Sequence, residues 1–154
     1  LAEMEQAGKL SAIITQNIDG LHQAAGSKNV FELHGSVHRN YCQKCGKFFD
    51  VNYVVNAKGV PYCDECGGII KPDVVLYEEG LDSQTINGAV RAISKADMLI
   101  IGGTSLVVYP AAGMIDYFKG KYLAVLNRDA TSRDKQADLC ITDPIGEVLG
   151  RIRV

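Results

Sequence analysis

The sequence lacks a long apolar run, an excess of charge of one sign, and any internal repeat or low-complexity segment. Its apolar runs, such as residues 98–101, are far shorter than the roughly 20 residues that a membrane-spanning helix needs, and no signal peptide is recognisable. Lys and Arg number 16 against 18 Asp and Glu, which gives a formal net charge of −2. A protein that binds nucleic acid over its whole surface is normally strongly basic. Membrane-spanning and broadly nucleic-acid-binding classes are therefore excluded.

What is present is typical of a globular protein. The 154 residues are 47% hydrophobic and 22% charged, which suits one domain or a domain with a small insert. The first residue is Leu1 and not Met, and it lies in what reads as the end of a helix. We therefore expect the chain to be a piece of a longer protein.

Cysteines are the first informative feature. Four of the five form two Cys-x2-Cys pairs separated by 17 residues, and these are Cys42, Cys45, Cys63 and Cys66. Two such pairs can place four thiolates around one zinc ion, and since all four ligand positions are filled by protein, the ion is predicted to be structural. Two disulfides in a secreted domain and a thiol-redox role are the alternatives. The fifth cysteine, Cys140, is expected to be a small buried side chain.

Short β-rich apolar runs alternate with helical stretches, which predicts an α/β fold with a doubly wound parallel sheet. The expected strands are residues 11–16, 73–77, 98–101, 122–126 and 139–142. The expected helices are residues 1–10, 17–25, 110–118 and 144–152, and one that begins at Asp82 and shares a single apolar face among Ile86, Ala89, Val90 and Ile93. The strands are fewer than a full dinucleotide-binding fold contains, so the sheet is predicted to be partial and Rossmann-like. A zinc ribbon is predicted as an insert at residues 39–71, between 1–38 and 72–154.

Polar clusters follow three of the predicted strands, at residues 15–20, 102–105 and 127–129. Ligands of α/β sheets lie beyond the carboxyl ends of the strands, and a glycine pair followed by Thr104 and Ser105 offers donors for phosphate or ribose oxygens. An ordinary strand-to-helix turn has the same pattern, so both interpretations stay open. His34, just before the cysteine pairs, is either a general base or a structural or surface histidine.

Several segments, in order, resemble the signature motifs of sirtuins, and their style is similar to the bacterial members. They are Thr15-Gln-Asn-Ile-Asp-Gly-Leu-His22, Leu33-His-Gly-Ser36, the two cysteine pairs, Lys71-Pro-Asp-Val-Val-Leu-Tyr77, Gly103-Thr-Ser-Leu106 and Leu126-Asn-Arg128. The resemblance covers the chain from about Ser11 onward. It implies that residues 1–38 and 72–154 form an NAD-binding domain.

The resemblance also implies an activity, that of an NAD-dependent protein-lysine deacylase that releases nicotinamide and an O-acyl-ADP-ribose. His34 matches the family's general base, and Asn17 is expected to be catalytic beside it. The residues that match NAD contacts are Gln16, Asn17, Ile18, Asp19, Gly103, Thr104, Ser105, Asn127, Arg128 and Ile145. The residues that match the strand pairing with the substrate backbone are Val74, Val75, Leu76 and Tyr77. NAD and one structural zinc ion are the implied cofactors.

Two departures from the family pattern are visible. The family's substrate segment usually reads aromatic-Gly-Glu, and here it reads Tyr77-Glu78-Glu79. The family's N-terminal segments, with a Gly-Ala-Gly loop for the pyrophosphate, have no counterpart, and no Gly-x-Gly occurs in the sequence. We therefore expect a C-terminal portion of a sirtuin that is inactive on its own.

Two other functions stay open beside deacylation. One is ADP-ribosyl transfer on the same scaffold, and the other is a zinc-ribbon binding module without catalysis. The expected partners are proteins that carry an acylated lysine, with no nucleic acid and no membrane. Reduced cysteines and the lack of an export signal favour the cytoplasm, and the oligomeric state is not predicted.

Overall fold

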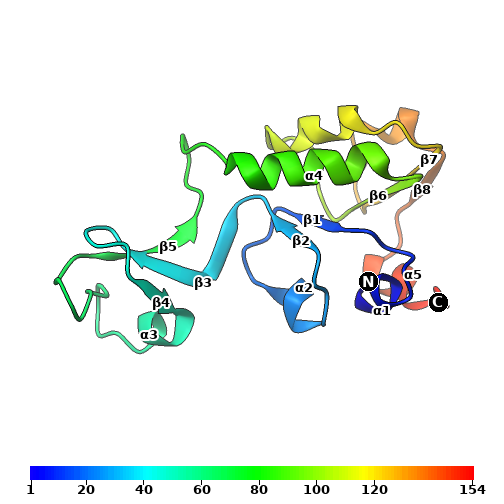
Figure 1. Cartoon of the computed structure of the whole chain (residues 1–154). Helices are drawn as coiled ribbons and strands as arrows, with labels where there is room; N and C mark the ends of the chain where they lie inside the picture. The colour runs from blue at the N-terminus through cyan, green and yellow to red at the C-terminus, as the bar shows by residue number, and fades with distance from the viewer.

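The computed structural model describes residues 1–154 and contains short helices and strands in two regions (Figure 1). In chain order the elements are α1 (Ala2–Gln6), β1 (Ile13–Thr15), α2 (Leu21–Ala24), β2 (Val30–Glu32), β3 (Gly35–Cys42), β4 (Phe48–Asp50), α3 (Val51–Val55), β5 (Ile70–Val74), α4 (Ser83–Lys95), β6 (Met98–Gly102), η1 (Ala111–Tyr117), β7 (Tyr122–Leu126), η2 (Asp134–Gln136), β8 (Leu139–Ile141) and α5 (Ile145–Gly150). None of the helices combines the length and the apolar character that a membrane crossing requires.

The parallel region contains two small sheets. β1 pairs with β2, and β6, β7 and β8 form a sheet in the order β6-β7-β8, with all neighbours parallel. The carboxyl ends of these last strands are aligned, because Gly102 pairs with Leu126 and Leu126 with Ile141. The predicted α/β class with parallel strands is confirmed. The strand β2 was not predicted, and the parallel strands form two sheets where one was expected.

Apolar side chains from α4 and η1 cover the strands of the parallel region, and Figure 1 shows the two helices side by side. One buried cluster consists of Leu33, Ala89, Ile93, Ala111 and Met114. A second consists of Ile101, Leu106, Ala112, Leu123 and Val125. Leu99 and Phe118 pack against both clusters, so the core of this region is continuous.

The helix α4 forms as its sequence predicts. The Asp82 side chain accepts a hydrogen bond of 2.7 Å from the Thr85 backbone N–H and so caps the helix. Ala89 and Ile93 are buried, and the rest of the predicted apolar face packs against the same cluster. The apolar face of this amphipathic helix therefore fixes it on the core.

The antiparallel region, which we call the ribbon, comprises residues 35–74, from the start of β3 to the end of β5. Its three strands have the order β4-β3-β5, and it extends to the left of Figure 1, away from both termini. Its buried cluster consists of Cys42, Phe49, Cys63 and Ile70. The sheet continues beyond both ends of the predicted insert 39–71, whose boundaries stay a prediction.

Two predicted elements near the candidate site are wrong in part. The helix expected at residues 17–25 is only α2, because Gly20 has a φ of +69° and residues 16–20 form a loop instead. The strand expected at 73–77 ends at Val74, and β5 pairs antiparallel with β3 and not with the parallel strands.

Three predictions near the C-terminal end also need correction. The helix expected at 110–118 is the 3-10 helix η1, and the last helix is shorter than the predicted 144–152. Cys140 is exposed and not buried, because β8 is the edge strand of its sheet and leaves Leu139 and Cys140 open to solvent.

Candidate active site and metal centre

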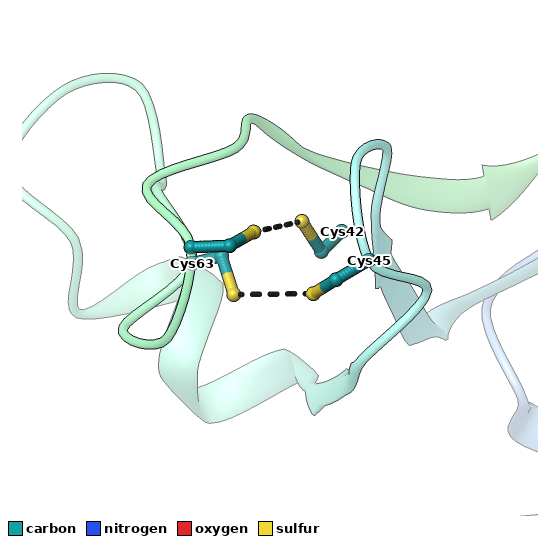
Figure 2. Close-up of side chains that lie close together, drawn as sticks. Cys42, Cys45 and Cys63 are labelled. Atoms are coloured by element: carbon teal, nitrogen blue, oxygen red, sulfur yellow. Dashed lines mark hydrogen bonds between the residues drawn. The ribbon is translucent and has the colours of Figure 1, made fainter.

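The four paired cysteines converge at one end of the ribbon. Their sulfur atoms all lie within 4.8 Å of one another. The Cys42 and Cys66 Sγ atoms are 3.3 Å apart, and those of Cys45 and Cys63 are 3.7 Å apart (Figure 2). A zinc ion bound tetrahedrally at about 2.3 Å from each sulfur sets the sulfurs about 3.8 Å apart. The predicted cluster is therefore confirmed, and its donors fit one zinc ion.

The surroundings of the sulfurs also suit a metal. The Lys44 backbone N–H lies 3.3 Å from Cys42 Sγ, in the turn that follows this cysteine. A Cβ atom added at Gly68 would come within 2.8 Å of the same sulfur, so the second turn approaches as closely as only glycine permits. Backbone donors and a tight turn thus enclose the cluster.

Hydrogen bonds among the four cysteines leave the metal-free cluster only partly ionised. The backbone N–H of Cys45, together with that of Lys44, lowers the pKa of the Cys42 thiol to about 6. The Lys47 backbone acts to lower the pKa of Cys45, but the Cys66 and Cys42 side chains outweigh it and raise that pKa to about 12. A zinc ion binds thiolates and displaces the remaining thiol protons, so metal binding releases protons and acid weakens it.

The loop after β1, which holds the predicted residues Gln16, Asn17, Ile18 and Asp19, rests against β3 and the residue before it. The Val37 backbone N–H donates to Ile18 O at 3.0 Å, and the His38 ring lies 2.9 Å from Asp19 O through Nε2. Asn17 N donates to the Thr15 hydroxyl at 3.0 Å, and Asp19 accepts from Leu21 N at 3.0 Å. The loop is thereby held beside the start of the ribbon.

His34 lies in the same group of residues and is half-buried. Its Nδ1 atom is 3.0 Å from the backbone oxygen of Gln16. A carbonyl oxygen only accepts hydrogen bonds, so Nδ1 carries a proton, and in the neutral imidazole the free lone pair is on Nε2. This tautomer can accept a proton from a substrate hydroxyl.

The segment that holds the predicted residues Val74, Val75, Leu76 and Tyr77 adjoins His34. The Val75 backbone N–H donates to His34 O at 3.1 Å. Gly35 has a φ of +77°, and a Cβ atom there would overlap the carbonyl oxygen of Asp73, so the two chain segments approach closely only because this residue is glycine. Tyr77 is fully exposed. The end of β5 is therefore fixed against His34 while its continuation is open.

Two charged residues that sequence reasoning missed hold this continuation. The Leu76 backbone N–H donates to the Glu79 carboxylate at 2.8 Å, and Lys71 Nζ donates to Val74 O at 3.0 Å. The bond from Leu76 N–H, helped by the Lys71 charge, lowers the pKa of Glu79. Residues eight positions apart outside a helix carry no pairing signal in a sequence.

Glu78 replaces the glycine of the family pattern, and the backbone keeps the conformation that favours glycine. Its φ is +71°, which costs a residue with a Cβ atom about 1–2 kcal/mol. The turn at this position therefore forms with a glutamate in a conformation that favours glycine.

A second group of predicted residues lies at the carboxyl ends of β6, β7 and β8. The Gly103 backbone N–H donates to Leu126 O at 3.1 Å, and Asn127 N donates to Ile141 O at 3.0 Å. The Ile145 side chain packs against Gly102 so closely that a Cβ atom there would overlap it. Gly103, Thr104, Ser105, Asn127, Arg128 and Ile145 are thereby placed around adjoining strand ends.

The structure thus places the predicted residues in two groups, one around His34 and one around Gly103. No hydrogen bond joins the β1-β2 sheet to the β6-β7-β8 sheet, so the groups are connected through the shared core. Hollows of about 510 Å³ beside Tyr53 and Tyr62 and about 420 Å³ beside Arg133 lie elsewhere. The role of each predicted residue stays a prediction.

Comparison with curated proteins gives close relatives. Proteins called NAD-dependent protein deacetylase from Clostridium acetobutylicum and Clostridium perfringens are 66% identical over 150 residues and 65% identical over 153 residues. These alignments cover 97% and 99% of this chain but 61% and 63% of the relatives. The chain therefore spans about three fifths of their length.

Solved structures give the same result. A Sir2 crystal structure in complex with the inhibitor EX-527, 2′-O-acetyl-ADP-ribose and a deacetylated p53 peptide has a TM-score of 0.89 and 41% identity, and the match covers 97% of this chain and 66% of that one. A Sir2 structure bound to an acetylated peptide has a TM-score of 0.89 and 39% identity, with 97% and 65% covered.

The family model described as the Sir2 family matches residues 1–110, and it agrees with the relatives, the solved structures and the clustered cysteines. The sirtuin resemblance is confirmed: the chain belongs to the Sir2 family.

Proposed function

We propose that this chain contributes the general base, the substrate-docking strand and part of the nucleotide site of an NAD-dependent protein-lysine deacylase. The relatives that are 66% and 65% identical are called NAD-dependent protein deacetylases, and a matching Sir2 structure is bound to an acetylated peptide. The observation that supports the proposal most strongly is the state of His34.

His34 acts as the base. Because Gln16 O holds the proton on Nδ1, Nε2 is available to take a proton from a ribose hydroxyl. Asn17 contributes to catalysis beside it, and Asp19, in the same loop on β3, lines the ribose and nicotinamide pocket. Amide groups at Gln16 and Asn17 orient polar groups without adding a charge to the site.

The continuation of β5 receives the substrate backbone. The Val75 carbonyl and the Tyr77 N–H take part in no hydrogen bond, although Val75 N–H and Leu76 N–H are already used. An extended peptide that carries an acylated lysine can pair with these free groups, as a strand adds to the edge of a sheet. Such pairing gives affinity with little demand on the sequence of the partner protein.

The second group binds the adenosine end of the cofactor. Gly103, Thr104 and Ser105 offer N–H and hydroxyl donors, Asn127 and Arg128 lie at the next strand end, and Ile145 closes the side. NAD, when bound, supplies the ribose carbon that the acyl oxygen attacks as nicotinamide leaves. The cysteine cluster binds zinc and stabilises the ribbon, with no part in the chemistry. The proposal places the protein in the cytoplasm, where free thiols stay available to zinc.

The test is nicotinamide release from NAD with and without an acetyl-lysine peptide. We would assay the chain alone and the chain fused to the part of the Clostridium acetobutylicum relative that it does not match. His34→Ala is expected to reduce peptide-dependent release about 100-fold or more, because the proton acceptor is lost. His22→Ala is the matched control, since the His22 side chain makes no hydrogen bond, and it should change release little.

Each outcome decides between functions. Peptide-dependent release that needs His34 supports deacylation. Release without peptide indicates ADP-ribosyl transfer or NAD hydrolysis. No release from either protein, with zinc bound and the fold intact, overturns the proposal in favour of a binding module.

A further inference from the structure

One arginine joins two chain segments, one that leads into His34 and one that leads into the substrate-docking strand. Arg39 lies in β3, in the irregular stretch between Ser36 and Asn40 where the register with β5 shifts. Its Nη1 atom is 2.6 Å from Glu32 Oε2, and its Nε atom is 2.8 Å from Asp73 Oδ2. A single planar guanidinium therefore bridges two carboxylates.

The two carboxylates lie close in sequence to predicted site residues, so the bridge connects those residues. Glu32 ends β2, two residues before His34, and Asp73 directly precedes Val74 in β5. Next to His34, these segments are otherwise joined through the backbone, by the bond from Val75 N to His34 O and by the pairing of Gly35 with Val74 and of Ser36 with Asp73. The Arg39 side chain therefore adds a tie between the parallel region and the ribbon at this point.

The Glu32 partner is nearly buried, which separates this pair from the other ion pairs of the ribbon. The Glu32 side chain is 8% exposed, whereas the carboxylates of Asp64 and Glu65 that pair with Lys47 are 52% and 65% exposed. Exposed ion pairs contribute little to stability, but a charge-assisted hydrogen bond that is shielded from solvent fixes the geometry of its partners. Lys47 also ties the ribbon only to itself.

We propose that Arg39 is a positioning residue that sets the placement of His34 relative to the strand that receives the acyl-lysine peptide. It touches neither cofactor nor substrate and acts through Glu32 and Asp73. The proposal rests on the proposed function for the meaning of His34 and of Val74–Tyr77. The coupling of these two segments through Arg39 can be tested by spectroscopy, whether or not the protein is catalytically active.

The variants are chosen so that folding does not obscure the result. Replacing Arg39 alone leaves Glu32 charged, shielded and unpaired, so the main variant is the double substitution Glu32→Gln/Arg39→Gln, which removes both charges. Arg39→Lys keeps the positive charge but replaces the planar guanidinium with a point charge, so this variant should retain function only in part. Arg133→Gln is the matched control, because Arg133 pairs with Asp116 at 2.7 Å and Gln136 at 3.1 Å, far from His34 in the sequence and in neither site group.

Two spectroscopic measurements apply to the chain with zinc bound. Nitrogen-15 NMR of His34 is expected to show the Nδ1-protonated tautomer in the unaltered protein and a mixture of tautomers in the double variant. Hydrogen exchange of the Val75 amide, which is bonded to His34 O, is expected to become at least about tenfold faster, as local opening is eased. Arg133→Gln should leave both readouts unchanged.

Kinetics on the active form, as defined in the nicotinamide assay, add a functional readout. The double variant is expected to lose about 10- to 100-fold in kcat/KM for the acetyl-lysine peptide, while KM for NAD stays the same, because a small misplacement of reacting groups carries such a cost. An unchanged His34 tautomer and Val75 exchange rate in the double variant would overturn the inference, as would equal losses toward peptide and NAD. If the unaltered protein releases no nicotinamide, the proposed function fails and the two spectroscopic readouts alone decide the role of Arg39.

Discussion

The ribbon and the parallel region are stabilised by different means. Two of the four buried residues in the ribbon core are cysteines, Cys42 and Cys63, which are also predicted zinc ligands. The parallel region buries ten aliphatic and methionine side chains in two connected clusters and needs no metal for them. A small unit that cannot bury enough apolar surface substitutes a metal for a core. The stability of the ribbon should therefore depend on zinc, and that of the parallel region on packing.

Zinc removal should separate the stabilities of the two regions most strongly, because it should affect the ribbon alone. Structural zinc sites contribute about 10 kcal/mol or more of binding energy, which folds the unit that holds them. Chelation, or the substitution Cys42→Ala, is expected to remove hydrogen-exchange protection from the strands of the ribbon while α4 stays protected. Zinc content and hydrogen exchange by mass spectrometry measure both.

Cys140→Ala is the control for this experiment, since Cys140 is exposed and lies outside the cluster. It should keep both zinc and protection. A Cys42→Ala protein with full zinc content and full protection of the ribbon would show that the metal does not hold the ribbon together.

A core truncation should have the opposite regional effect. Ile93→Ala in α4 removes a side chain that is 4% exposed, and the loss of burial and the cavity cost about 3 kcal/mol. Chemical denaturation monitored by the α4 signal should show this loss. Ile69→Ala in the ribbon, where the side chain is 52% exposed, should stay within about 0.5 kcal/mol. Equal losses from the two substitutions would contradict the regional picture.

Removing a helix cap should affect the stability of one region at a time, with a smaller effect than zinc removal or a core truncation. Asp82 caps α4 in the parallel region, and Asp50 caps α3 in the ribbon through the Tyr53 backbone N–H at 2.9 Å. Asp82→Ala is expected to lower the Tm of the parallel region by about 3 °C, since a lost cap frees backbone donors. Asp50→Ala should affect only the ribbon.

The Asp82 cap also predicts a pH dependence with a definite sign. The bond from Thr85 N–H holds the pKa of Asp82 below its ordinary value of 3.8. The stabilisation is therefore present above pH 3.8 and is lost as the pH falls through the lowered value. The difference in Tm between the natural protein and Asp82→Ala should shrink steadily as the pH falls below 3.8, and a difference that grows in acid would contradict this cause.

Local signals explain which parts could be predicted from the sequence. The Cys-x2-Cys spacing gives the metal cluster, because each pair forms its own tight turn. The apolar face and the cap at Asp82 give α4, and β6, β7 and β8 lie close to the predicted runs. These elements depend on residues a few positions apart.

Contacts between distant residues explain the failures. The loop at residues 16–20 is non-helical because it rests on Val37 and His38, which lie some twenty positions away. The pairing of β5 with β3 joins residues such as Ser36 and Asp73, and no local pattern specifies it. The Arg39 bridge is invisible for the same reason. The tautomer of His34 likewise depends on a backbone oxygen that only the folded chain brings near.

The way in which the chain enters and leaves the ribbon has a consequence for evolution. It departs at Gly35 and returns at Val74, and these residues are paired neighbours, as are His34 and Val75 through their backbone. A segment whose ends already meet can lengthen or shorten at a small entropic cost, because loop closure depends only weakly on length. Insertions and deletions among sirtuins should therefore gather between these two points, where the chain can exchange one module for another without disturbing His34 beside it.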